Sequence, residues 1–339
     1  MITIDPHSKA PLYKQITDYI ERGVHDGSLK AGSLLPSMNE LAADLGISKE
    51  TVKKAYGYLS AKGIVEPKQG KGFFVADQNA RSRVQVLLIF DRLSLYKQIL
   101  LDQFQETLGP DAEITILNHN QSVDLLTYYL DSNLDRFDWY VIAPHFPLDQ
   151  ETQAKAIRQL KRIPFRKLIL IDNLPEGLRG QFGAVYQDFE NDIYDGLTEG
   201  LDAERRGTLH AITLPTSLYA PIIRKSIERF GHDNGIQVEF HTQTPAFIRR
   251  GDTFLVLNSQ LDAGLVALAR RIERQGLVIG EDVRIISYNE YEINELILGG
   301  LTTVSTDFRE MGHTAANMIL SRKLVQTRNP FHMTRRKTF

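Results

Sequence analysis

Most of the chain alternates short apolar runs with amphipathic stretches. Residues 84–90 (VQVLLIF) form an almost unbroken apolar run, which is typical of a strand buried on both faces. The next apolar residues recur at helical spacing, at Ile99, Leu100, Phe104 and Leu108. The same signals predict strands at 113–117, 138–143, 167–171, 208–214, 236–240, 253–257 and 283–287, and helices at 121–133, 149–161, 188–203, 219–234, 261–275 and 307–320. Such alternation predicts an α/β fold with parallel sheets covered by helices.

The first 75 residues have a different pattern. One helix is predicted over 11–27, and a second begins after Pro36-Ser37 and ends at Gly46-Ile47, which suits a tight turn between helices. Ser48 is placed to cap a third helix, which buries Val52, Ala55 or Tyr56, and Leu59. Two short β runs follow, at 64–65 and 73–75, joined by a basic tip that contains glycines, 67–72. This order predicts a winged helix-turn-helix over 1–75, a domain that presents a helix and a basic loop to DNA.

Charge supports a DNA-binding role for this region. Six lysines and two glutamates lie between Lys49 and Lys71, a local net charge of +4, whereas the whole chain carries −2. Clustered positive charge binds phosphates, although a lysine-rich helix face is often merely solvated. The order of the elements favours DNA. The candidate DNA contacts are Ser37, Asn39, Ser48, Lys49, Glu50, Thr51, Lys53, Gly70, Lys71 and Gly72.

Length and composition bound the remaining possibilities. The 339 residues suggest about two domains, and we place a polar linker at 76–83 between a first domain at 1–75 and a second at 84–339. The chain has no cysteine, which excludes disulfides and thiolate metal sites. No signal peptide pattern and no apolar run approaching about 18 residues is present, so we expect a cytoplasmic protein that does not enter a membrane. The sequence also lacks a P-loop and a G-x-G-x-x-G motif, and we predict no cofactor, no metal site and no enzymatic activity.

Polar residues directly follow several predicted strands. In open parallel sheets, ligands bind in the crevice outside the carboxyl ends of the strands. The segments expected there are Asp91-Arg92, Pro144-His145, Asp172-Asn173, Pro215–Tyr219, Asn258-Ser259 and Tyr288–Glu290.

Residues 9–75 resemble the DNA-binding domain of the GntR family of bacterial transcription regulators. The motifs that carry the resemblance are Pro11-Leu12-Tyr13-x-Gln15-Ile16, Gly27-x-Leu29-x-x-Gly32-x-x-Leu35-Pro36-Ser37, Glu40-Leu41-Ala42, Gly46-Ile47-Ser48-x-x-Thr51-Val52-x-x-Ala55-Tyr56-x-x-Leu59, Gly63-x-Val65 and Gly70-Lys71-Gly72-x-Phe74-Val75. The family often has arginine where this chain has Asn39, Lys49 and Lys53, and lysine reads guanine less rigidly than arginine does.

Residues 84–339 resemble the effector domain of the LacI/GalR family, a two-lobed fold like that of periplasmic sugar-binding proteins. The resemblance is carried by Thr213–Ile236, Phe254–Asn289 and Gly300–Leu320. A GntR-type head with such a domain is similar to the arabinose-repressor type of regulator. The effector-binding positions that the resemblance implies are Asp91, His145, Phe146, Asp172, Tyr219, Arg224, Asn258 and Asn289, with Tyr219 and Phe240 as an aromatic floor.

Each effector residue has a plainer interpretation. Arg224 could form a helical ion pair with Glu228, Asp172 could only shape a turn, and His145 could be a structural loop residue. We expect a homodimeric, sugar-responsive regulator, most simply a repressor, on a double-stranded operator, and by analogy its effector is a pentose or 6-deoxyhexose such as arabinose or fucose. The alternative is a GntR-type head fused to a pyridoxal-phosphate-dependent, aminotransferase-like domain.

Overall fold

The computed structural model divides into two compact units, Met1–Arg83 and Val84–Phe339. It describes residues 2, 4–5, 8, 10–68, 71–76, 83–200, 207–213, 218–257 and 263–339. The linker expected at 76–83 lies mostly outside the described residues. Among the described residues, no helix is both long enough and apolar enough to cross a membrane.

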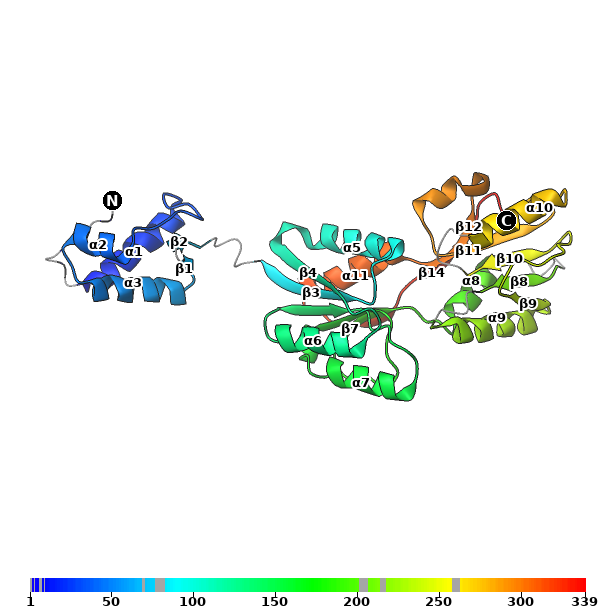
Figure 1. Cartoon of the computed structure of the whole chain (residues 1–339), viewed down its shortest axis with the longest axis horizontal. Helices are drawn as coiled ribbons and strands as arrows, with labels where there is room; N and C mark the ends of the chain where they lie inside the picture. Colours follow the sequence, from blue (N-terminus) through cyan, green and yellow to red (C-terminus); the bar gives the residue numbers. More distant parts are fainter. Residues whose placement is uncertain are drawn as a thin grey trace. The chain divides into compact units, whose positions relative to one another are not determined.

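The first unit is a winged helix-turn-helix, as the sequence predicts. Its elements are α1 (Leu12–His25), α2 (Met38–Leu45), α3 (Lys49–Ala61) and an antiparallel hairpin of β1 (Val65–Lys68) and β2 (Gly72–Val75), shown in Figure 1. The helices and the hairpin share one apolar core, and both Ala55 and Tyr56 are buried in it. The Tyr56 hydroxyl donates to the Pro36 carbonyl at 2.7 Å, and the Tyr56 ring packs on Phe73 of the wing with ring centroids 4.9 Å apart. Tyr56 therefore ties α3 to the start of α2 and to the wing.

The ends of α2 and α3 are fixed by local hydrogen bonds. The Ser37 hydroxyl accepts from the Glu40 amide, and the Glu40 carboxylate accepts from the Ser37 amide, which is a complete capping box. Gly46 ends α2 with φ +64°, a left-handed conformation that favours glycine. The Ser48 hydroxyl then accepts from the Thr51 amide and starts α3. These caps fix where α2 begins and ends and where α3 begins.

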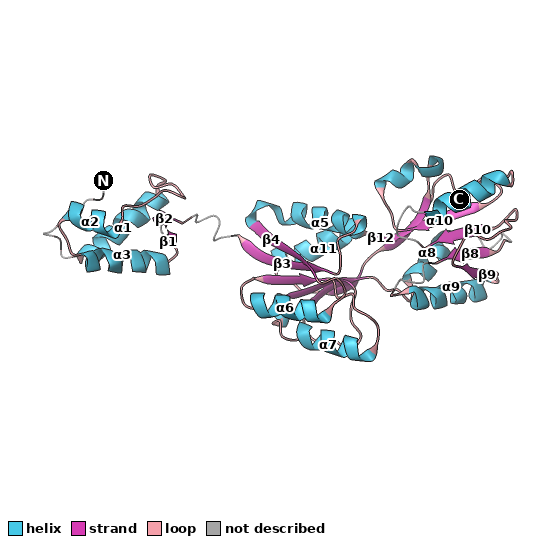
Figure 2. Cartoon of the chain, viewed as in Figure 1, coloured by secondary structure: helices cyan, strands magenta, loops and turns pink. Residues whose placement is uncertain are grey.

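The second unit consists of two lobes, each a six-stranded sheet with helices on both faces (Figure 2). The first lobe has an all-parallel sheet in the order β13-β7-β6-β5-β3-β4. Helices α5 (Leu95–Leu108) and α11 (Phe308–Ser321) cover one face, and α6 (Val123–Asn133) and α7 (Gln150–Leu160) cover the other. The strands are β3 (Val84–Phe90), β4 (Ala112–Asn118), β5 (Trp139–Ile142), β6 (Leu168–Asp172), β7 (Gly183–Tyr186) and β13 (Gln326–Arg328), and the 3-10 turns are η1 (Gly109–Asp111) and η2 (Phe165–Lys167).

The second lobe has the strand order β14-β12-β11-β10-β8-β9, with β14 antiparallel at one edge. Helices α8 (Asp192–Gly200) and α9 (Ala220–Asn234) pack on one face, and α10 (Ala263–Arg274) packs on the other. The strands are β8 (Leu209–Ile212), β9 (Val238–His241), β10 (Thr253–Val256), β11 (Arg284–Tyr288), β12 (Thr302–Thr306) and β14 (Phe331–Thr334), and the 3-10 turns are η3 (Glu292–Glu295) and η4 (Ile297–Gly299).

The chain crosses between the lobes after β7, after β12 and after β13. Asn329 joins the crossings: its side-chain amide donates to Thr306 Oγ1 at 2.7 Å and to the Asp307 carbonyl at 2.8 Å, and its backbone amide donates to the Tyr186 carbonyl at 2.8 Å. The predicted alternation of strands and helices is confirmed within a few residues. No strand was predicted at β7, β12, β13 or β14, and the first three of these directly precede a crossing.

Candidate DNA interface and ligand cavity

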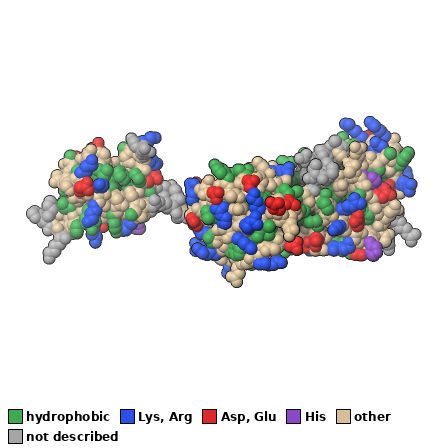
Figure 3. All heavy atoms as spheres, turned by 60° about the horizontal axis from the view of Figure 1, so that its bottom comes forward, with side chains coloured by type: hydrophobic (Ala, Val, Ile, Leu, Met, Phe, Trp, Pro, Cys, Tyr) green, Lys and Arg blue, Asp and Glu red, His purple; other side chains and the backbone are tan. Residues whose placement is uncertain are grey.

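The predicted DNA contacts lie on the surface of the first unit. Ser37 and Asn39 lie at the start of α2, Ser48 to Lys53 lie in the first turns of α3, and Lys71 and Gly72 lie in the wing. All are exposed except Thr51, which is half-buried, and Gly70 lies outside the described residues. Figure 3 shows basic side chains on the face of this unit that is turned to the viewer. The arrangement suits a helix N-terminus and a wing that approach phosphates together.

The lysines of this unit differ in how far they are held by neighbours. Lys62 pairs with Glu21 at 2.9 Å, Lys68 pairs with Glu66 at 2.9 Å, and Lys54 lies over the Tyr13 ring at 4.1 Å. Lys53 lies 3.7 Å from Glu50, and because both side chains are well exposed this pair is weak. Within the described part of the chain, no ion pair engages Lys49 or Lys71. Among the predicted DNA contacts, Lys49, Lys53 and Lys71 are therefore cations that remain available to DNA.

A cavity of about 970 Å³ opens between the lobes of the second unit. Five of the eight predicted effector residues line it. Asp91, His145 and Asp172 come from the first lobe, where they follow β3, follow β5 and end β6. Tyr219 and Asn289 come from the second lobe, where they precede α9 and follow β11. The carboxyl ends of the parallel strands thus bring together side chains that are far apart in sequence, as expected for a ligand site in such sheets.

A buried lysine connects two of these carboxylates. Lys97 of α5 is 1% exposed, and its Nζ contacts Asp91 Oδ1 and lies 3.4 Å from Asp172 Oδ2. Burial lowers the pKa of Lys97, and the nearby Asp172 opposes that effect. Burial by itself would raise the pKa of Asp172, but His145 and Lys97 beside it hold that pKa below its usual value. The two carboxylates and the lysine thus compensate one another in a region with little water.

His145 lies at the centre of a hydrogen-bonded chain. Its Nε2 lies 2.8 Å from Asp172 Oδ2, and its Nδ1 lies 2.7 Å from the Tyr219 hydroxyl. Burial lowers the pKa of His145, so the ring is neutral at pH 7. The neutral tautomer that satisfies both contacts has Nε2–H donating to Asp172 and Nδ1 accepting from Tyr219. Gln187, in the segment that leaves the first lobe, donates to the other oxygen of Asp172.

Aromatic rings form the apolar part of the cavity. Phe189 and Tyr219 stack face to face, with ring centroids 3.9 Å apart and planes inclined by 9°. Tyr288, Tyr291 and Phe308 also line the cavity. A polar set of carboxylates, amides and a lysine beside stacked aromatics is typical of sites that bind polyhydroxylated ligands.

Three residues expected at the effector site do not line the cavity in this structure. Arg224 does not line the cavity: its side chain is 56% exposed, its Nε lies 2.9 Å from Glu228 Oε1, and its guanidinium covers Phe240 at 4.2 Å. Phe240 is therefore a support for Arg224 and not a cavity floor. Phe146 is fully buried and stacks on His119, with centroids 4.3 Å apart. Arg224 thus lies on the outer surface of α9, with Phe240 beneath it, whereas Phe146 packs inside the first lobe. Asn258 lies outside the described residues.

The sequence interpretation also missed several lining residues, among them Lys97, Gln187 and Phe189. The burial of Lys97 could have been predicted from the sequence. Lys97 precedes the buried Leu100, Leu101 and Phe104 at helical spacing, so it belongs to the buried stripe of α5. A lysine on such a stripe needs a buried anionic partner. Gln187 and Phe189 follow β7, a strand that was not predicted, so no pattern marked them.

Comparison with known proteins agrees with this architecture. Residues 12–75 match the family of bacterial regulatory proteins named gntR, and residues 238–338 match the periplasmic binding protein-like domain. The transcriptional repressor YtrA of Bacillus subtilis is 34% identical over 102 residues, which are 30% of this chain and 78% of YtrA. The chain belongs to the gntR family of bacterial regulatory proteins. It is a transcription regulator with a winged helix-turn-helix and a two-lobed second domain.

Relatives and solved structures extend the likeness into the second unit of this gntR-family regulator. The regulator TreR of Bacillus subtilis is 29% identical over 182 residues, 51% of this chain and 68% of TreR. The repressor MngR of Escherichia coli is 36% identical, but the match spans only 34% of its length. The trehalose repressor of Escherichia coli superposes with a TM-score of 0.56 at 15% identity, covering 75% of this chain and all of that chain. A dimeric Lac repressor gives 0.57 at 16% identity, covering 75% and 98%. At these identities the structures show the fold, and that fold is not the aminotransferase-like alternative.

Proposed function

We propose that this regulator represses transcription, and that a neutral sugar in the cavity between the lobes changes its affinity for an operator. The observation that carries the proposal is the joining of polar and aromatic side chains from both lobes around one cavity, in a chain whose first unit is a DNA-binding domain. YtrA and MngR are named as repressors, and the trehalose repressor shares the fold of the second unit.

The charges of the cavity favour a neutral ligand. Its charged lining residues, among those described, are Asp91, Asp172, Lys97 and Arg92, two of each sign. Lys97 lies against both carboxylates and Arg92 lies 3.9 Å from Asp91, so the lining charges balance and a ligand does not need to bring a charge of its own. Sugar hydroxyls can donate to carboxylate oxygens and accept from Gln187 and Asn289, while a sugar ring face can pack on an aromatic ring. Asp91 and Asp172 would repel the phosphate of a phosphorylated sugar. Lys97 is already engaged by these carboxylates, so the exposed Arg92 would be its cationic partner among the described lining residues.

The cavity volume constrains the size of the ligand less closely than the lining charges constrain the charge of the ligand. Small-molecule sites commonly enclose about 300–1,000 Å³. The 970 Å³ cavity is therefore roomy for a single sugar ring. The cavity can be filled in two ways: the lobes close around a monosaccharide, or the ligand has a second sugar ring. We favour a pentose or 6-deoxyhexose such as arabinose or fucose, on the resemblance to the arabinose-repressor type, with lobe closure completing the site.

Closure gives the sugar a way to act on DNA binding. A ligand shifts a conformational equilibrium only by its differential affinity for the two states. Contacts from both lobes, such as Asp172 on one side and Asn289 on the other, are made together only in one relative placement of the lobes. We propose a homodimer assembled through the second unit, so that lobe closure changes how two winged helices meet a two-fold symmetric operator.

A thermal-shift screen tests the ligand class. The intact protein is heated with arabinose, fucose, common hexoses, trehalose and the corresponding sugar phosphates. A ligand present at 100 times its Kd stabilises the folded protein by roughly 2.7 kcal/mol, which raises Tm by several degrees. We expect one or more neutral sugars to raise Tm, and Asp172→Asn to remove that shift. A shift with phosphorylated sugars alone would contradict the charge argument, and no shift with any carbohydrate would contradict the proposed effector class.

A further inference from the structure

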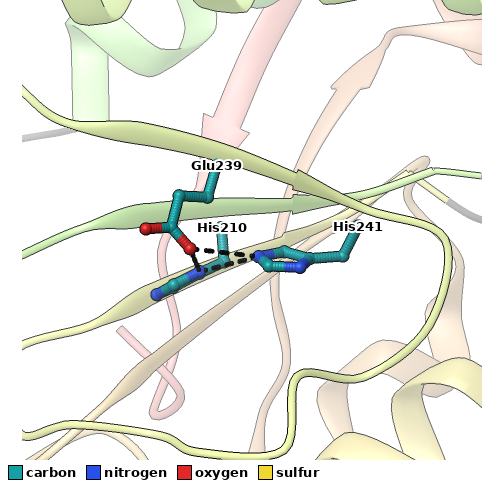
Figure 4. Close-up of side chains that lie close together, drawn as sticks. All are labelled: His210, Glu239 and His241. Carbon is teal, nitrogen blue, oxygen red and sulfur yellow. Dashed lines mark hydrogen bonds and ion pairs between the residues drawn. The ribbon is translucent and has the colours of Figure 1, made fainter.

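Three metal-binding residue types meet at the edge of the second lobe, away from the cavity. Strands β8 and β9 are parallel neighbours, and His210 is paired in register with Glu239. His241 lies two residues beyond Glu239, and alternation along a strand places residues two apart on the same face of a sheet. His210, Glu239 and His241 therefore converge on one face, as Figure 4 shows.

The three potential ligand atoms are spaced as a metal site requires. His210 Nδ1 lies 2.9 Å from His241 Nε2 and 3.6 Å from Glu239 Oε2, and His241 Nε2 lies 3.7 Å from Glu239 Oε2. Zinc binds imidazole nitrogen and carboxylate oxygen at about 2.0–2.2 Å, and tetrahedral angles then put ligand atoms about 3.3–3.6 Å apart. The observed separations bracket this value. A small adjustment of side-chain rotamers would place one ion at bonding distance from all three atoms.

The surroundings of His210 suit a metal ligand. The His210 ring stacks on Phe254 of β10, with ring centroids 4.9 Å apart and planes inclined by 14°, and the residue is buried. If Nδ1 binds a metal, the proton must sit on Nε2. That atom is buried, makes no aligned hydrogen bond to any described residue, and lies 3.3 Å from Asp252 Oδ2. Asp252 is itself held by the Arg249 amide at 2.8 Å. A carboxylate behind a ligating histidine is the usual outer support of zinc sites.

We propose that His210, Glu239 and His241 bind one divalent transition-metal ion of the zinc class. Two imidazoles and one carboxylate are the donor set that zinc accepts with a fourth position left for water or another ligand. Glu239 is 45% exposed and His241 is 21% exposed, so solvent reaches that position. The ion would join the edge strand β9 to β8 and so stabilise this end of the second lobe. The proposed site departs from the sequence-based expectation of no metal.

The metal-free alternative is a hydrogen bond between the two imidazoles, with Glu239 accepting weakly at one side. The two interpretations differ in stoichiometry and spectrum. Protein freed of metal by chelation is titrated with Co²⁺, whose tetrahedral complexes absorb strongly in the visible range, and then with Zn²⁺ in competition. We expect one ion per chain, visible absorption bands that Zn²⁺ abolishes, and a higher Tm in the presence of either metal.

Variants of the proposed ligands, compared with a control variant in the same lobe, test which residues bind the metal. His241→Gln removes one ligand from a partly exposed position, and Glu239→Gln removes another at an exposed position where a folding defect is not expected. Each should weaken Co²⁺ binding at least tenfold. The control is His232→Gln in the same lobe: this side chain is 89% exposed and has one acidic neighbour, Asp233. Wild-type Co²⁺ affinity in both Glu239→Gln and His241→Gln would overturn the proposal, as would the absence of binding at micromolar metal.

Discussion

The hydroxyl oxygen of Tyr219 lies 2.7 Å from Nδ1 of His145, and this contact joins the two lobes of the second unit across the cavity. His145 comes from the first lobe and Tyr219 from the second. Through His145 the contact reaches Asp172 and, from there, Lys97 and Asp91. A ligand that bonds to any member of this chain therefore acts on the link between the lobes. The relationship gives the proposed response a specific structural basis.

Replacing Tyr219 with phenylalanine should isolate this link. Tyr219→Phe keeps the ring that stacks on Phe189 but removes the donor to His145. A hydrogen bond between neutral groups contributes about 1 kcal/mol, so we expect the sugar found in the thermal screen to bind roughly fivefold more weakly, as measured by calorimetry. The matched control is Arg224→Ala on the outer face of α9, which should bind the sugar like the wild type. A loss in Arg224→Ala equal to that in Tyr219→Phe would return Arg224 to the binding site.

Removing the buried cation should destabilise the second unit. Lys97→Met leaves Asp91 and Asp172 buried without their shared partner, and breaking a buried ion pair from one side costs about 3–5 kcal/mol. Urea unfolding is readily followed by fluorescence, because Trp139 in β5 is the only tryptophan of the chain. Adding Asp91→Asn to Lys97→Met should recover part of the loss. A Lys97→Met protein as stable as the wild type would show that the carboxylates do not depend on the lysine.

Stability should fall on acidification because of His119. Its Nε2 lies 2.9 Å from the Ala143 carbonyl, its Nδ1 accepts from the Gln121 amide at 3.1 Å, and burial lowers its pKa to about 4. An unfolded histidine has a pKa near 6.5, so the unfolded chain binds more protons between these values. The stabilising contribution is present above about pH 6.5 and is lost as pH falls towards 4, a difference of about 3 kcal/mol.

The slope of unfolding free energy against pH measures this effect. His119→Gln should flatten the slope between pH 4 and 6.5, whatever it does to stability at neutral pH. An unchanged slope in His119→Gln would mean that another group titrates in this range.

Lysines of the first unit should differ in their effect on DNA binding. Lys71→Ala and Lys53→Ala should each weaken operator binding and reduce the slope of log K against log salt by about 0.9, since each removes one phosphate contact. Lys62→Ala is the matched control, because Lys62 is held by Glu21 and lies over Tyr58. Fluorescence anisotropy at several salt concentrations gives the slopes. Equal slopes for all three variants would argue against a specific role for the wing and α3.

Helices and strands were predicted most accurately where a single periodic pattern of apolar residues dominates the segment. The run at 84–90 and the helix after it were located correctly, because both faces of β3 are buried and α5 has a regular apolar stripe. Strand β7 was missed because its four residues, GAVY, are too short and too small to stand out from a loop. Strand β12 is rich in threonine, and its burial comes from neighbouring elements that sequence periodicity does not show.

The site residues, like the strands, could be predicted from local sequence patterns only in part. His145 and Asp172 could be placed together because they lie at the carboxyl ends of neighbouring parallel strands, His145 just after β5 and Asp172 as the last residue of β6. The family resemblance places Arg224 at the effector site, but the structure pairs it with Glu228 one helical turn away, and Ile223 and Ile227 define the buried face of α9. His210 and His241 gave no local signal, since their proximity depends on the register between β8 and β9. Local patterns specify elements, whereas register and lobe crossings decide which side chains meet.

The central test measures operator affinity with and without sugar. An operator is selected from genomic fragments by the intact protein, and its affinity is then measured by anisotropy with saturating amounts of the sugar that raises Tm. Allosteric coupling commonly changes affinity about 5–150-fold. We predict a change of this size in the wild type and in Arg224→Ala, and none in Asp172→Asn, which should bind the operator normally. An operator affinity that stays constant while calorimetry shows the sugar bound would contradict a sugar-controlled repressor.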